Sequence, residues 1–259
     1  MTDLVVVERE GEIAKITLNQ PAKLNALNNA MWTRLGELFA ELDGDDGLRC
    51  VILAGSGERA FSVGADISEF EENRSTLERA RRYHERTHAA MQAIADCRHP
   101  VIARIRGLCV GGGLELATIC DLRICGDGAR FGIPVKRLGL VVSYTELEPL
   151  VDLIGPANAL EILLEGRMYG ADDALRMGLV NRVVPDTEVE HEALATAARI
   201  AEGAPLVARW HKKFTRRLMR AEPLSDQEMD ESFHCFETAD FRAGYRAFLA
   251  KTKPEFEGR

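Results

Sequence analysis

The residue in this sequence best suited to chemistry is Glu115, an acid that follows three consecutive glycines, Gly111 to Gly113, in an otherwise apolar stretch. Glycines directly before a helix leave backbone N–H groups exposed at the positive end of the helix dipole, because no side chain blocks an approaching anion. A carboxylate is seldom buried without a partner or a function. The pattern favours an acid beside an anion pocket. It also fits glycines that let a helix pack closely on a sheet, with Glu115 as a first-turn charge that interacts with the dipole.

The glycine run does not match the motifs of nucleotide-binding loops. It contains neither G-x-G-x-x-G nor G-x-x-x-x-G-K-[ST]. Both motifs bind phosphates through glycines at fixed offsets before a helix. The sequence therefore supports neither a Rossmann nor a P-loop mechanism.

A second segment repeats the order of strand, small-residue loop and helix start. Residues 48–55, with an apolar run at 50–54, predict a strand. Residues 56–64 predict a loop, and residues 65–70 predict the start of a helix. Two such loops can each direct one backbone N–H at a single oxygen, which is how an oxyanion hole for a thioester enolate is built.

Five motifs in chain order carry a resemblance to a known family. They are Asn25-Ala26-Leu27, AF-x-x-GADI at 60–67, GGG-x-E-LA-x-x-CD at 111–121, FG-x-P at 131–134 and A-x-x-x-GLV at 174–180. Together they resemble the enoyl-CoA hydratase/isomerase (crotonase) superfamily. The resemblance implies an α/β fold in which residues 1–185 form a crotonase-like spiral of ββα repeats. It also implies a C-terminal helical region, 186–259, that packs homotrimers or dimers of trimers.

The same resemblance assigns roles to individual residues. The N–H groups of Ala65 and Gly112 would hold the thioester oxygen, and Glu115 would be the acid and base. The coenzyme A moiety would be bound by Lys23, Asn25, Ala26, Ala65, Asp66, Ile67, Phe248 and Lys251. The acyl pocket would include Phe70, Gly111, Val135, Leu140, Ser143 and Tyr144. Lys23 and Lys251 would meet phosphates, unless they are ordinary surface lysines.

The sequence departs from the family at its second catalytic position. Classical hydratases carry a glutamate directly after the proline of FG-x-P, and this chain has Val135 there. Water addition normally uses two carboxylates, one for the water and one for the proton at the alpha carbon. Hydration of a 2-enoyl-CoA with Glu115 alone is the leading hypothesis.

Other activities stay open. The same site could serve an isomerase, or a decarboxylase or thioester hydrolase that uses Ser143, Tyr144 and Glu146, although Tyr144 and Glu146 also fit a surface or helix-start role. In a different class, the protein would be a non-catalytic acyl-CoA binder or an assembly subunit.

Periodicity and capping signals predict the elements that hold these residues. Residues 4–7 and 13–18 predict a hairpin, and Asn28 is expected to cap a helix that ends near residue 42. Strand and helix patterns alternate from 48 to 135, which predicts a parallel sheet with helices outside it. Further helices are expected to begin with a capping box formed by Ser75 and Glu78 and at Gly155-Pro156. Breaks at 203–205, 222–223 and near 238 divide the tail into four helices.

Composition excludes several classes of function. The 259 residues carry a net charge of -8 with no basic block, which argues against nucleic acid as the main ligand. The chain lacks an apolar run long enough to span a membrane and has no signal-peptide pattern at its start, so a cytoplasmic location is expected. The cysteines form no C-x-x-C pair, and His84 and His88 have no further ligand beside them. We expect no metal, and no cofactor other than the coenzyme A of the substrate.

Overall fold

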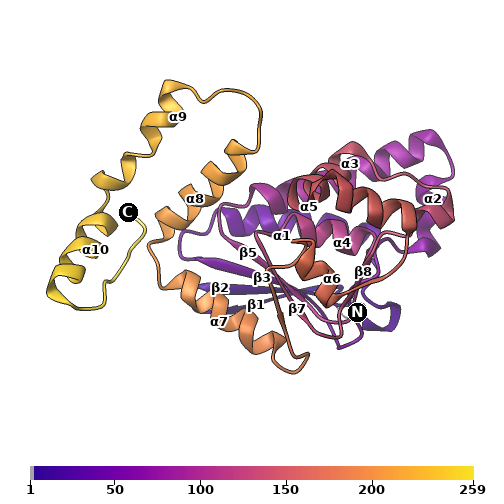
Figure 1. The fold of residues 1–259 in the computed structure, drawn as a ribbon, viewed down its shortest axis with the longest axis horizontal. Helices are drawn as coiled ribbons and strands as arrows, with labels where there is room; N and C mark the ends of the chain where they lie inside the picture. The colour runs from indigo at the N-terminus through magenta and orange to yellow at the C-terminus, as the bar shows by residue number, and fades with distance from the viewer. Residues whose placement is uncertain (1–2) are drawn as a thin grey trace.

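The computed structural model describes residues 3–259, and Figure 1 shows how they are arranged. Their strands form a six-stranded sheet in the order β1-β2-β3-β5-β7-β10 and a four-stranded sheet in the order β4-β6-β8-β9. The strands are β1 (Val5–Glu10), β2 (Ile13–Leu18), β3 (Cys50–Gly55), β4 (Ala60–Ser62), β5 (Val101–Ile105), β6 (Leu108–Val110), β7 (Leu122–Gly126), β8 (Arg130–Gly132), β9 (Tyr169–Gly170) and β10 (Arg182–Val184). The first pair is an antiparallel hairpin, and the other pairs of the larger sheet are parallel.

Helices cover both faces of the larger sheet. The α-helices are α1 (Asn29–Asp43), α2 (Phe70–Arg74), α3 (Leu77–Asp96), α4 (Gly112–Thr118), α5 (Tyr144–Glu165), α6 (Ala171–Arg176), α7 (Val189–Ala201), α8 (Pro205–Leu218), α9 (Asp226–Glu231) and α10 (Ala239–Ala250). Short 3-10 helices are η1 (Pro21–Lys23), η2 (Ile67–Glu69), η3 (Val135–Leu138) and η4 (His234–Glu237). Strand β3 is buried along its whole length, as expected for a parallel strand with helices on both sides.

The two sheet faces belong to different parts of the chain. One face packs with α1, α3, α4 and α5 into the main core. The other is covered by α7, whose buried Val189, Ala193 and Ala197 recur every four residues and contact Ile52 and Ile102. We assigned α7 to the C-terminal region that begins at 186, yet its packing completes the core of the preceding part.

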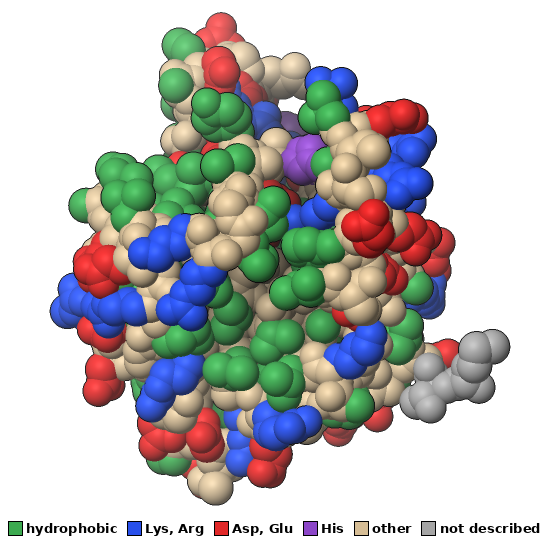
Figure 2. Space-filling view, turned by 90° about the vertical axis from the view of Figure 1, so that its right-hand side faces the viewer, with side chains coloured by type: hydrophobic (Ala, Val, Ile, Leu, Met, Phe, Trp, Pro, Cys, Tyr) green, Lys and Arg blue, Asp and Glu red, His purple; other side chains and the backbone are tan. Residues whose placement is uncertain are grey.

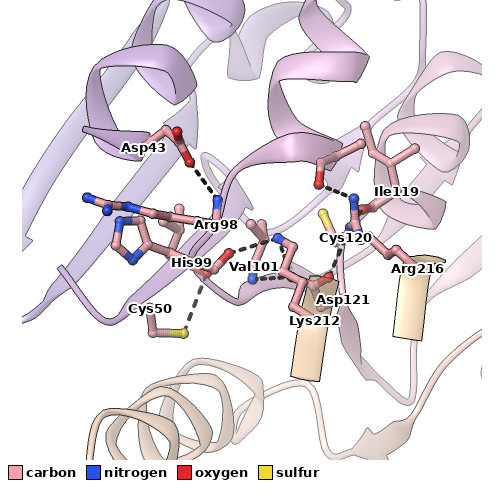
Figure 3. Close-up of polar contacts among 12 residues, drawn as sticks. Asp43, Cys50, Arg98, His99, Val101, Ile119, Cys120, Asp121, Lys212 and Arg216 are labelled. Carbon is pink, nitrogen blue, oxygen red and sulfur yellow. Dashed lines mark hydrogen bonds and ion pairs between the residues drawn. The ribbon is translucent and has the colours of Figure 1, made fainter. Parts of the chain in front are cut away.

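Helices α9 and α10 lie away from the sheets, at the yellow end of the chain in Figure 1. Helix α8 joins them to the core through Asp121, which follows α4 (Figure 3). The Asp121 carboxylate accepts hydrogen bonds from Val101 N at 2.7 Å, Lys212 Nζ at 2.8 Å and Arg216 at 2.9 Å. Lys212 also donates to the backbone oxygen of His99 at 2.8 Å. These contacts fix the base of the C-terminal helices on the core.

Several local predictions are confirmed. The hairpin forms with Val5 opposite Leu18, and Asn28 caps α1 by accepting the N–H of Met31 at 2.9 Å. The four tail helices are α7 to α10, with the expected breaks between them.

One of the two predicted helix starts is wrong. Thr76, not Ser75, caps α3 and accepts the N–H of Arg79 at 3.2 Å, because Thr76 has the extended backbone of a cap whereas Ser75 is still helical. The predicted start at Gly155-Pro156 is confirmed, because α5 consists of two helices joined at a kink where Gly155, with φ of 75°, is not helical. The first of these two helices begins at Tyr144.

Within residues 3–259, none of the helices combines the length and apolar character that a membrane crossing needs. All six cysteines are free thiols, and all but Cys235 are buried.

Candidate active site

The first site loop is positioned by a buried asparagine. The Asn25 side chain is fully buried and donates to the backbone oxygens of Ser56 at 3.0 Å and Ala60 at 2.8 Å. Ser62 donates to the Asn25 backbone oxygen at 2.8 Å and accepts the N–H of Gly64 at 3.1 Å. The Asn25 side chain therefore holds this loop, while the coenzyme A contact expected of the backbone at residues 23–26 stays a prediction.

Ala65 follows in an extended bridge that leaves its own N–H unused. Leu27 N donates to Gly64 O at 2.7 Å, and Asp66 N donates to Leu27 O at 2.9 Å. Ala65 lies between these two bonds, and its N–H donates to no acceptor in residues 3–259.

The second site loop brings Gly112 next to Ala65. Gly111 has a positive φ of 52° and donates to Gly132 O at 2.9 Å, which turns the chain into α4 with Gly112 as its first residue. A Cβ on Gly64 would lie 2.8 Å from Gly112 N, and one on Gly112 would lie 3.7 Å from Ala65 N. Only glycine at 64 permits this approach. The Gly112 N–H, a free first-turn donor, also has no acceptor in the described chain.

Glu115 lies one turn into α4 and beside this pair of donors. Its Oε2 would be 3.7 Å from a Cβ built on Gly112. Burial raises the pKa of Glu115 to about 8, with a further upward contribution from Glu146 and a downward one from Arg74. The carboxyl group forms no hydrogen bond or ion pair with another residue of 3–259. An acid that is protonated at neutral pH and free to exchange its proton is suited to acid–base catalysis.

These groups line one cavity of about 290 Å³. Its wall is mainly apolar and includes four of the six predicted acyl-pocket residues, namely Phe70, Gly111, Val135 and Leu140. Ser143 and Tyr144 do not line it, because Ser143 caps α5 and the Tyr144 side chain is 92% exposed. Figure 2 views the molecule from the side on which α2 lies in Figure 1, and hydrophobic side chains gather near the middle of that face.

A second carboxylate, Glu146, lines the same cavity. Its Oε2 accepts hydrogen bonds from Ser143 N at 3.0 Å and Ser143 Oγ at 2.6 Å. This reciprocal capping box opens α5 and fixes the direction of the carboxylate. Sequence reasoning treated a helix-start role and a pocket role for Glu146 as alternatives, and the structure gives it both.

Trp32, Arg74 and Tyr83 also line the cavity. The sequence indicated that residues 70–83 fold over the acyl pocket but did not single out Arg74 or Tyr83, and it did not indicate Trp32. Arg74 ends a short charged helix, where an arginine is unremarkable by pattern. The i, i+4 pattern of α3 predicts which residues are buried, but it does not distinguish core residues such as Tyr83 from cavity walls.

The predicted coenzyme A residues fall into two groups. Lys23, Ala26, Asp66 and Ile67 surround the first loop, where Lys23 Nζ bonds to Asp66 at 2.7 Å. Lys23 and then Ser68 hold the pKa of Asp66 below its usual value. Phe248, 83% exposed, and Lys251 lie at the end of α10, far from α2 and α3 in Figure 1. Within one chain, these two residues are not brought to the cavity.

Comparison with known proteins identifies the family. The family model for enoyl-CoA hydratase/isomerase matches residues 8–259. The chain belongs to the enoyl-CoA hydratase/isomerase family. A short-chain-enoyl-CoA hydratase of Clostridium acetobutylicum is 35% identical over 97% of this chain and 96% of its own, and a crotonyl-CoA hydratase of Syntrophomonas wolfei is 34% identical over 97% of each.

Solved structures of this family match the fold throughout. An enoyl-CoA hydratase/carnithine racemase from Magnetospirillum magneticum superposes with a TM-score of 0.98 at 46% identity, covering 100% of this chain and 97% of that one. The expectation of a crotonase fold is therefore confirmed. No group of three or more His, Cys, Asp or Glu residues with the geometry of a metal site occurs in the part of the chain that the structure describes.

Proposed function

We propose that the protein adds water across the double bond of a 2-enoyl-CoA thioester. The observation that carries the proposal is the pair of unused N–H groups of Ala65 and Gly112, which lie together beside the unpaired acid Glu115. Two convergent donors suit an oxygen that becomes negative during the reaction. The names of the relatives support hydration as the reaction.

In the proposed mechanism, the thioester oxygen accepts both N–H groups, which stabilise the enolate formed when water attacks the beta carbon. Glu146 takes a proton from the attacking water, and its orientation by Ser143 favours this role. Glu115, protonated at pH 7, gives its proton to the alpha carbon. The water oxygen and one hydrogen thus end on the beta carbon and one proton on the alpha carbon. Transfer of a proton from Glu146 to Glu115 through solvent restores the site.

This assignment explains how the family reaction proceeds with Val135 in place of the usual second glutamate. Val135 and Glu146 line the same cavity, so a carboxylate is supplied from α5 instead of η3. In this mechanism Glu115 donates a proton and Glu146 accepts one, which is the general division of work between paired catalytic carboxylates.

The decisive experiment uses crotonyl-CoA in deuterated water. Hydration should consume the enoyl thioester and place deuterium on the alpha carbon of the 3-hydroxyacyl product, as measured by absorbance and NMR. Deuterium exchange or double-bond movement without hydration would favour an isomerase, and release of free thiol a hydrolase. Binding with none of these reactions would favour the non-catalytic binder.

Variants at position 112 test the oxyanion hole. Gly112→Pro removes one N–H donor at a helix position that tolerates proline and should lower kcat about a hundredfold or more. Gly112→Ala is the matched control because it keeps the donor, and its Cβ would meet neighbours at 3.6 and 3.7 Å, which is ordinary contact. Equal activity of the two variants would contradict the role of this N–H.

We further propose that the chain assembles as a homotrimer or a dimer of trimers. The C-terminal helices expose large apolar side chains that a neighbouring copy would cover, namely Phe233, Phe236, Phe241, Tyr245, Phe248 and Leu249. A neighbour bound there would also allow Phe248 and Lys251 to approach another subunit's coenzyme A. Light scattering coupled to size exclusion tests the stoichiometry, and a monomer at micromolar concentration would contradict it.

A further inference from the structure

The cavity contains a cation without an anionic partner. The Arg74 guanidinium carbon lies 4.6 Å from the ring centre of Phe70 and 4.3 Å from that of Tyr83. Its Nε is buried without a hydrogen-bond partner, and none of the ion pairs within residues 3–259 includes Arg74. Leaving a guanidinium N–H buried and unbonded is unfavourable unless a ligand later satisfies it.

Arg74 is not simply the counter-ion of the two cavity carboxylates. Neither Glu115 nor Glu146 lies within ion-pair distance of it, and Glu146 is bonded to Ser143 instead. The pKa of Glu115 remains raised to about 8 even though Arg74 lowers it, so this acid is not neutralised by the arginine. The charge of Arg74 is therefore available to a molecule in the cavity.

Arg74 lies against the buried side of the cavity wall, because its guanidinium stacks on Tyr83. The lining residues Trp32, Tyr83 and Thr87 are 2%, 7% and 2% exposed and form the inner wall. Ile67, Leu138 and Val141, which are 61%, 53% and 90% exposed, form the rim. Because coenzyme A is far larger than a cavity of about 290 Å³, it must leave across the rim. The acyl chain then extends inward, toward the ring of Tyr83 on which Arg74 stacks.

We propose that the preferred substrate is the coenzyme A monothioester of a dicarboxylic acid, and that Arg74 binds the free carboxylate at the far end of the acyl group. The planar guanidinium, held between two aromatic rings, offers parallel N–H donors that suit a carboxylate. The apolar walls between Arg74 and the N–H pair suit the intervening methylene groups. This inference depends on the proposed function only in placing the thioester oxygen at Ala65 and Gly112.

The test compares binding of two saturated thioesters that cannot be hydrated. Glutaryl-CoA and valeryl-CoA have five-carbon acyl chains and differ in a terminal carboxylate against a methyl group. Isothermal titration calorimetry should show that the wild-type protein binds glutaryl-CoA about tenfold to a hundredfold more tightly than valeryl-CoA. This ratio corresponds to the free energy of a hydrogen bond to a charged group. Succinyl-CoA and adipyl-CoA extend the series. A preference for any of the three dicarboxylic thioesters over its methyl-ended counterpart supports the proposal, and no preference at any length overturns it.

Substitutions of Arg74 identify the group responsible. Arg74→Met should abolish or reverse the preference while changing the valeryl-CoA affinity little, and Arg74→Lys should retain part of it. The matched control is Arg137→Met, which removes the exposed cation at the rim of the same cavity and should leave the ratio of the two affinities unchanged. If Arg74→Met weakens both thioesters equally, Arg74 binds the coenzyme A moiety or serves the fold, and the proposal is wrong.

These measurements are separate from the test of hydration. Tight binding of dicarboxylic thioesters with no turnover of any enoyl-CoA would overturn the proposed function and leave this inference in place. Rapid hydration of crotonyl-CoA with no preference for the terminal carboxylate would support the proposed function and overturn this inference.

Discussion

Two carboxylates, one inside α4 and one just beyond its C-terminal end, occupy opposite environments. Glu115, in the first turn, faces a cavity and has no hydrogen-bond partner in residues 3–259. Asp121, just beyond the last turn, is bonded to a backbone N–H, a lysine and an arginine (Figure 3). Within a few residues, the chain thus places one acid that is free to exchange a proton and one that is held by three donors.

The two acids have opposite effects on the free energy of folding, because Glu115 lacks a partner and Asp121 is paired. An unpaired buried acid is destabilising when ionised, and it persists where chemistry requires it. A carboxylate that joins a lysine 8% exposed to a core strand stabilises the attachment of α8. Removing the Glu115 charge should therefore affect turnover, and removing the Asp121 charge should affect stability.

The largest expected effect is on turnover by Glu115→Gln. Glutamine has nearly the same shape but cannot transfer a proton, so kcat for crotonyl-CoA should fall about a thousandfold, within the range for loss of a general acid. Affinity for a saturated thioester should be nearly unchanged, because the two N–H donors remain. Retention of more than about a tenth of the activity would move the proton transfer to another residue.

A smaller loss is expected for Glu146→Gln. The amide can still accept a hydrogen bond from Ser143 but cannot take a proton from water, so kcat should fall about a hundredfold. Glu148→Gln is the matched control because Glu148 is an exposed residue of the same helix. If the two variants are equally active, the second carboxylate of the proposed mechanism is dispensable and Glu115 acts alone.

The third effect is on stability. Asp121→Asn leaves Lys212, 8% exposed, without its carboxylate, and should lower the free energy of unfolding by about 2 to 3 kcal/mol, less than for a fully buried pair because the Asp121 side chain is 21% exposed. Denaturant titration measures this change. The kcat of the folded fraction should remain within about twofold of wild type, since the ion pairs lie outside the cavity. A large kcat loss with unchanged stability would reverse the assignment of the two acids.

The sequence predicted the site residues that have a local signal and not those that reach the cavity through contacts between distant segments. Each glycine-containing loop was predictable by itself because glycine alone fits its backbone, as at Gly64 and Gly111, whereas the convergence of the two loops was implied by the family resemblance. Glu115 was found because an acid in an apolar helix is a local anomaly. Arg74 and Glu146 reach the cavity only through tertiary packing, and no local pattern distinguishes them from surface charges.

For the fold, too, features that depend on neighbouring residues were easier to predict than individual contacts between distant segments. The hairpin and the Asn28 cap depend on neighbouring residues, and both were correct. The choice between Ser75 and Thr76 as a cap depends on how α2 meets α3, and it was wrong. The packing of α7 on the sheet joins residues more than a hundred positions apart, such as Ile52 and Ala193, which no periodicity within either segment can pair.

The smallest effect concerns the pH dependence of stability. The folded-state pKa of Glu115 is about 8 against an ordinary value of 4.5, so between these values the folded protein binds more protons at this site than the unfolded chain. Its contribution to the free energy of unfolding is therefore fully present below about pH 4.5 and is lost as the pH rises toward 8. Glu115→Gln has no such proton. Relative to wild type, the variant should become more stable by about 1 to 2 kcal/mol between pH 5 and pH 9, a value reduced from the full shift because water reaches the cavity.

Denaturant titrations of the ligand-free proteins at both pH values measure this difference, with Glu148→Gln as the control for an exposed glutamate. A difference between Glu115→Gln and wild type that stays constant with pH would mean that Glu115 ionises normally in the folded protein. Glu115 would then be ionised at neutral pH. The contrast between the two acids would rest on hydrogen bonding alone, and Glu115 could not enter the reaction as the proton donor.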